Sequence, residues 1–97
     1  MNVAALLIVQ ATVLHKDSYR KYQAAVQPLI QSCGGRLRAT GAELEVLEGS
    51  PPGRRLVIFE FPSMDALQAF WRSPQYAAIK PLREGAAQID AWAVPSG

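Results

Sequence analysis

The stretch Arg55–Phe61 reads RLVIFEF and is the strongest strand signal in the chain. It is rich in β-branched and aromatic residues, and Pro62, which cannot extend a ladder of backbone hydrogen bonds, ends it. Because side chains alternate along a strand, both faces of this one are apolar. One face carries Val57, Phe59 and Phe61, and the other carries Leu56, Ile58 and Glu60. Both faces of this strand are therefore expected to be buried away from water.

Three further strands are predicted around this one. Residues 3–14, VAALLIVQATVL, are apolar on both faces and suit a strand in the middle of a sheet. Residues 36–48 form a second strand with Gly41 as a bulge or bend. The turn GSPPGR, residues 49–54, leads into the Arg55 strand, and residues 88–94 form the last strand.

Two helical regions lie between the strands. The first takes residue 17 or 18 as its N-cap, carries an apolar stripe and ends at Gly34 in the left-handed C′ position. Pro28 is expected to kink or restart this helix, because proline lacks an N–H group. The second region begins after Ser63 and restarts after Ser73, each serving as an N-cap.

The order β-α-β-β-α-β predicts one α+β domain over residues 1–97 with a ferredoxin-like fold. Its antiparallel four-stranded sheet has the strand order 4-1-3-2, and both helices cover one face. The opposite face carries an apolar set formed by Leu6, Ile8, Leu56, Ile58 and Trp92. A monomer rarely exposes such a patch, so a second copy is expected to cover it and to form a dimeric α/β barrel.

Composition and charge limit the partners. Ten Lys and Arg against eight Asp and Glu give a net charge of +2 without a basic stripe, which argues against nucleic acid and membranes. RNA-recognition motifs share this element order, but their stacking positions fall here on the aliphatic Leu56 and Ile58. The apolar start of the chain is too short to cross a bilayer. With Cys33 as the only cysteine, a cytoplasmic location is expected.

Five stretches together resemble one known family. They are DSYRKY (17–22), CGG (33–35), VLEG (46–49), RLVIFEFP (55–62) and FWRSPQY (70–76). As a set they are similar to the domain of unknown function 1330 family, in the dimeric α/β-barrel superfamily. The resemblance covers nearly the whole chain and implies a ferredoxin-like protomer, a homodimer that shares a barrel, and small bacterial proteins without an agreed reaction. The wider superfamily includes cofactor-independent monooxygenases, isomerases and haem-handling proteins, but fold alone transfers none of these activities.

Glu60 is the first candidate for chemistry. It alternates into the uncovered sheet face, where a carboxylate must be paired or have a raised pKa. Arg38 and Gln10 fall on the same face and are its expected partners. The simpler interpretation is an ion pair that only sets the register of the dimer.

Aromatic side chains supply the second set of candidates. Tyr19, Tyr22, Trp71 and Tyr76 lie on helical stripes, either as core residues or as the lining of a cleft that their hydroxyls reach. We take Tyr22 and Trp71 as ligand-binding residues, together with Trp92 on the uncovered sheet face.

His15 is the only histidine and lies just past the first strand. It is a candidate general base, although an exposed loop residue is the simpler interpretation. One histidine and one cysteine cannot form a dense ligand cluster, so neither a metal site nor a bound cofactor is expected. Arg83 is either an anion clamp or a solvated side chain, and solvation is the simpler interpretation.

Two functions therefore stay open. The first is a cofactor-free enzyme or binder of a small, partly apolar molecule in a pocket near the mouth of the dimeric barrel. Glu60 would act as base or acceptor and Arg38 as a clamp, with His15 or Tyr22 nearby. The second is a non-catalytic dimerisation or regulatory module. A barrel with a cavity of roughly 300 Å³ or more favours the first, and a fully packed barrel interior favours the second.

Overall fold

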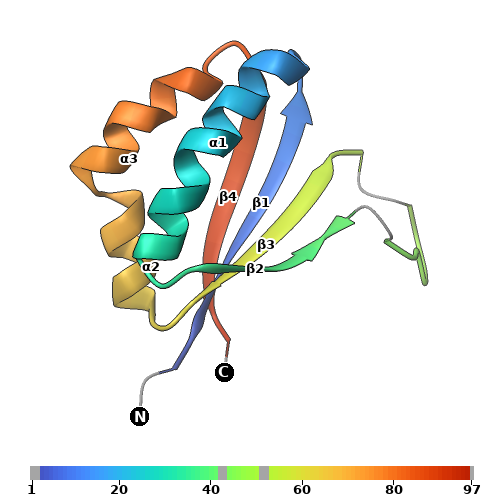
Figure 1. Ribbon diagram of the computed structural model, residues 1–97. Helices are drawn as coiled ribbons and strands as arrows, with labels where there is room; N and C mark the ends of the chain where they lie inside the picture. The colour runs from blue at the N-terminus through green and yellow to red at the C-terminus, as the bar shows by residue number, and fades with distance from the viewer. Residues whose placement is uncertain (1–2, 42–43, 51–52, 97) are drawn as a thin grey trace.

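The computed structural model describes residues 3–41, 44–50 and 53–96 and has the predicted ferredoxin-like topology (Figure 1). The antiparallel strands are β1 (Ala5–Val13), β2 (Arg36–Thr40), β3 (Arg55–Phe61) and β4 (Ala87–Pro95). The helices are α1 (Lys16–Ser32), α2 (Met64–Trp71), α3 (Pro74–Ile79) and the 3₁₀ helix η2 (Lys80–Arg83). The sheet order β2-β3-β1-β4 confirms the prediction, and the helices lie on one face of an open sheet. Within the described ranges, no helix has the length and apolar character needed to cross a membrane.

The central strand β1 decides which side chains share a face. Leu7 of β1 pairs with Phe59 of β3 and with Ala93 of β4. Odd-numbered β1 residues therefore point toward the helices, where Ala5 and Leu7 are buried. The even-numbered residues point to the opposite face, as predicted. We call this second surface the open sheet face.

The core lies between the helices and the sheet. Its largest fully buried side chains are Tyr76, Phe61 and Phe70. The rings of Phe61 and Phe70 stack with centroids 5.5 Å apart, which joins β3 to α2. Gly35 lets the chain pass close to this stack, because a Cβ atom there would lie 2.8 Å from the Phe61 ring.

The boundaries of α1 differ from the prediction at its start and in its middle. The helix begins at Lys16 after His15, so the expected cap at residue 17 or 18 is wrong. The His15 N–H donates to the Ala86 carbonyl at 3.0 Å and its own carbonyl accepts from Tyr19, which starts the helix before those side chains. The helix also continues through Pro28 without a restart. Pro28 is exposed, so water can reach the carbonyl group that it leaves unbonded.

Three other helix ends follow the prediction. Gly34 has a φ of 84° and its N–H donates to the Gln31 carbonyl at 3.0 Å, as expected for a glycine that ends a helix. The Ser63 hydroxyl accepts from the Ala66 N–H at 3.0 Å, and the Ser73 hydroxyl accepts from the Tyr76 N–H at 3.1 Å.

β2 is shorter than predicted and ends at Thr40 instead of residue 48. Thr40 pairs with Val57, and β3 begins only two residues before Val57, at Arg55. Because the strands are antiparallel, a longer β2 would have at most two further partners on β3. Residues 44–50 form no strand and leave the sheet, with Leu47 fully in solvent (Figure 1). The bulge lies at Arg38, where the register shifts, and not at Gly41.

Candidate functional site

A hollow lies between α1 and the sheet on the side covered by the helices. Its aromatic lining is formed by Tyr19, Tyr22, Phe59, Phe70, Trp71 and Tyr76. The cavity volume is only about 60 Å³. It adjoins an open groove of about 320 Å³ between α1 and β2–β3, and Gln23, Gln27 and Val57 line both. The groove exceeds the roughly 300 Å³ typical of a ligand site, but it lies on the helix side of the sheet. The pocket predicted near the barrel, on the opposite face, stays a prediction.

Two tyrosine hydroxyls meet beside this hollow. Tyr22 of α1 and Tyr76 of α3 are hydrogen-bonded with their oxygens 2.8 Å apart, and both side chains are buried. The Ser73 cap holds the backbone of Tyr76 at the start of α3. Burial, followed by the hydrogen bond to Tyr76, raises the pKa of Tyr22 well above its ordinary value. Tyr22 therefore keeps its proton at neutral pH and remains a hydrogen-bond donor.

Arg83, the last residue of η2, lies over two rings of the same aromatic group. Its guanidinium carbon is 6.0 Å from the centre of the Tyr22 ring and 5.8 Å from that of Trp71. These distances fall at the outer limit of cation–π contacts. The residue is partly buried beside these rings, and its two interpretations, an anion clamp and a solvated side chain, both stay predictions.

Glu60 lies on the open sheet face, away from the hollow. Arg36 donates to its Oε1 from Nη2 at 2.7 Å and from Nε at 3.1 Å. These bonds, with a smaller contribution from the charge of Arg38, hold the pKa of Glu60 below its ordinary value. A carboxylate in this state is a poor proton acceptor at neutral pH.

The partner of Glu60 is therefore Arg36, and not the predicted Arg38 or Gln10. The bulge at Arg38 places Arg36 directly opposite Glu60 in the ladder. Gln10 shares the face but pairs with Leu56 nearer the other end of β3. The alternation of side chains in residues 36–38 allows either Arg36 or Arg38 to face Glu60. Only the register of β2 against β3 identifies Arg36 as the partner.

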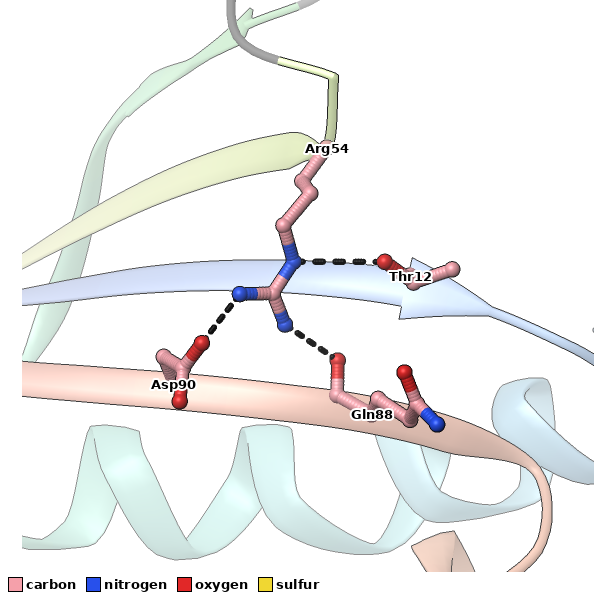
Figure 2. A network of polar contacts seen from close by, with 4 residues as sticks. All are labelled: Thr12, Arg54, Gln88 and Asp90. Carbon is pink, nitrogen blue, oxygen red and sulfur yellow. Dashed lines mark hydrogen bonds and ion pairs between the residues drawn. The ribbon is translucent and has the colours of Figure 1, made fainter.

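A second polar cluster occupies the other end of the open sheet face (Figure 2). Arg54, just before β3, reaches across β1 and forms an ion pair with Asp90 of β4. It also donates to the Thr12 hydroxyl at 3.2 Å and to the Gln88 carbonyl at 2.8 Å. Sequence reasoning missed Arg54 because it lies in the GSPPGR turn, where nothing indicates the direction of its side chain.

The predicted site residues thus fall into three separate places. Tyr22 and Trp71 line the hollow. Gln10, Arg38, Glu60 and Trp92 belong to strands that form the open sheet face. His15 is the exposed residue before α1 and belongs neither to the hollow nor to the open sheet face. Among the described residues, no group of three His, Cys, Asp or Glu side chains is arranged to hold a metal ion.

The Arg36–Glu60 pair predicts a pH dependence of stability. Because the pKa of Glu60 is depressed below 4.5 in the folded protein, its contribution is present above that pH and is lost as the pH falls through the folded value. We expect the urea midpoint to fall between pH 7 and about pH 3 by less in Glu60→Gln than in the unmodified protein. Arg36→Gln is the matched variant, since it removes the same pair from the other side. Identical pH profiles for all three proteins would contradict this assignment.

Comparison with known proteins places this architecture among characterised folds. Residues 4–96 match the family model described as "Domain of unknown function (DUF1330)". A protein of unknown function from Rhodopseudomonas palustris has a similar structure, with 16% identity, a TM-score of 0.76 and coverage of 100% of this chain and 85% of that one. No curated protein matches this chain.

Two further solved structures share the fold. A dimeric ferredoxin-like protein of unknown function from Thermobifida fusca has 15% identity and a TM-score of 0.65, covering 98% of this chain and 92% of that one. SnoaB, a cofactor-independent oxygenase from Streptomyces nogalater, has 9% identity and a TM-score of 0.68, covering 98% and 94%. At these identities the likeness extends to the fold alone.

Proposed function

Because this chain belongs to the DUF1330 family, whose description assigns no activity, we propose a function from the hollow itself. The protein binds a small, largely apolar molecule between α1 and the sheet. The observation that carries this proposal is the Tyr22–Tyr76 hydroxyl pair, 2.8 Å apart beside an aromatic lining. Small-molecule sites commonly combine such apolar walls with a few fixed polar groups that orient the ligand.

The shape of the space supports a ligand that enters from the groove. The enclosed part, at about 60 Å³, holds only a small head group, whereas the adjoining groove of about 320 Å³ has room for a flat apolar body. Val57 lines both parts and Leu37 lines the groove, so the groove wall includes apolar sheet residues. Leu37 is 56% exposed and would lose contact with water when a ligand occupies the groove.

A neutral fluorescent probe tests this proposal. N-phenyl-1-naphthylamine brightens when it enters an apolar site, and we expect saturable binding of one molecule per protomer. Val57→Phe, which adds a ring where hollow and groove meet, should weaken binding about tenfold or more. Val46→Phe is the matched control, since it makes the same change at an exposed residue outside the sheet that lines neither the hollow nor the groove. Equal binding by both variants would contradict the proposed site.

We also propose that the open sheet face pairs with a second copy of the chain. Its apolar part is formed by Leu6, Ile8, Leu56, Ile58, Trp92 and Val94. Trp92 is 49% exposed in the protomer, which is unusual for so large an apolar side chain. The flanking carboxylates of Glu60 and Asp90 already have arginine partners within the protomer. A self-complementary apolar centre with internally paired charges at its ends fits a two-fold interface.

The assembly is tested by light scattering after size-exclusion chromatography. We expect a dimer at micromolar concentration, and we expect Trp92→Glu to shift the protein to the monomer because it buries a charge in the interface. Leu82→Glu is the matched control, since Leu82 is similarly exposed, at 44%, but belongs to η2 on the helix side. A monomeric unmodified protein would contradict the proposed interface. So would an unchanged dimer in Trp92→Glu.

A further inference from the structure

The charged residues that line the hollow, the groove and a third depression near the start of α1 are all cationic. They are Lys16, Arg20, Arg36, Arg55 and Arg83. No Asp or Glu is among the described residues that line these spaces. A concave surface with charges of one sign concentrates ligands of the opposite sign.

The cations differ in whether a carboxylate already neutralises them. Arg36 is bound to Glu60 at 2.7 Å, and Arg20 lies 3.9 Å from Asp17. Within the described part of the chain, Lys16, Arg55 and Arg83 form no ion pair. Lys16 and Arg55 line only the spaces outside the hollow, whereas Arg83 lies beside the faces of Tyr22 and Trp71. Arg83 lines the hollow itself, so its charge remains available to a ligand there.

The tyrosine pair supplies a second group for an anion. Two hydroxyl groups carry two protons, and the single bond between Tyr22 and Tyr76 uses one of them. The other O–H is left to donate to an acceptor beside the pair. Tyr22 belongs both to this pair and to the ring face beneath Arg83, so donor and cation are adjacent.

We propose that the ligand is an apolar carboxylate, whose acid group lies between Arg83 and the Tyr22–Tyr76 hydroxyls. This inference rests on the proposed function and names its ligand class. A carboxylate suits the site because the enclosed part is small and Arg83 supplies a single uncompensated charge there. A phosphate ester with two charges would keep one of them unpaired among apolar walls, which is costly. The apolar body of the ligand extends toward the groove.

Displacement of N-phenyl-1-naphthylamine tests this class with two isosteric compounds, 1-naphthoate and 1-naphthamide. They differ in charge and hardly in shape. We expect the acid to compete about tenfold more strongly than the amide in the unmodified protein. Arg83→Gln should reduce this preference to about twofold or less, and Arg83→Lys, which restores the charge, should retain most of it. Arg72→Gln is the matched control, because Arg72 is exposed after α2 and lines a different hollow.

The outcomes separate the two proposals. If Val57→Phe blocks the neutral probe but the acid and the amide compete equally, the hollow binds ligands and the carboxylate inference is overturned. A preference for the acid that survives Arg83→Gln, or that Arg72→Gln removes, overturns it as well. If Val57→Phe leaves the neutral probe unaffected, the proposed function itself is contradicted.

Discussion

Replacing Phe61 with alanine is expected to lower the free energy of unfolding by about 3–5 kcal/mol. Phe61 is 0% exposed and stacks on Phe70, so removal of its ring leaves a cavity where β3 meets α2. Urea unfolding followed by tryptophan fluorescence measures the change. Protein concentration must be held constant, because a dimer gains stability with concentration.

Phe59→Ala is the matched control for this prediction. Phe59 lies two residues earlier on β3 and on the same face, but it lines the groove and is only partly buried. Its loss removes less buried area and leaves a space that water can enter, so we expect a clearly smaller effect. Equal losses for the two variants would mean that the groove at Phe59 is closed in solution.

The second large effect is expected for Gly35→Ala, which should cost about 1–3 kcal/mol through overpacking. The added Cβ would lie 2.7 Å from Cγ2 of Ile30 and 2.8 Å from Cε2 and Cζ of Phe61. Neither neighbour can move freely, because both are buried in the core. The same urea titration measures this loss.

Two further variants make the cause of this loss specific. Gly53→Ala should leave stability nearly unchanged, since nothing lies within 4 Å of the Cβ position there. In a Phe61→Leu background, Gly35→Ala should cost less than in the unmodified protein, because the two sites are in contact. Strictly additive effects would show that the close approach to the Phe61 ring is not the reason.

The elements that were predicted correctly depend on local patterns. The alternation of RLVIFEF assigned Phe59 and Phe61 to the helix side and Ile58 and Glu60 to the open sheet face, and the register confirms this. Such an assignment needs only the two-residue repeat of a strand. Ser63 and Ser73 cap the helices because each contact spans three residues, which is short enough to read along the chain.

The errors arose where a distant segment decides a local boundary. β2 ends at Thr40 because β3 offers few further partners, and α1 begins at Lys16 with the N–H of His15 bound to Ala86. Within residues 36–48 and 15–18 themselves, a longer strand and a later cap were equally compatible with the side chains. The end of β2 is determined by its pairing with Val57, 17 residues after Thr40. The start of α1 is determined by Ala86, 71 residues after His15.

By itself, the sequence determined the element order, the two faces of the sheet and the aromatic character of the helices, since these follow from spacings of two to four residues. Tertiary structure alone decided which polar groups act together. It brought the hydroxyls of Tyr22 and Tyr76, which are 54 residues apart, to a distance of 2.8 Å and placed Arg83 over the Tyr22 ring. On the opposite face of the sheet it paired Glu60 with Arg36. The physical reason is that a side chain's partner depends on how separate elements pack, and no local periodicity records that packing.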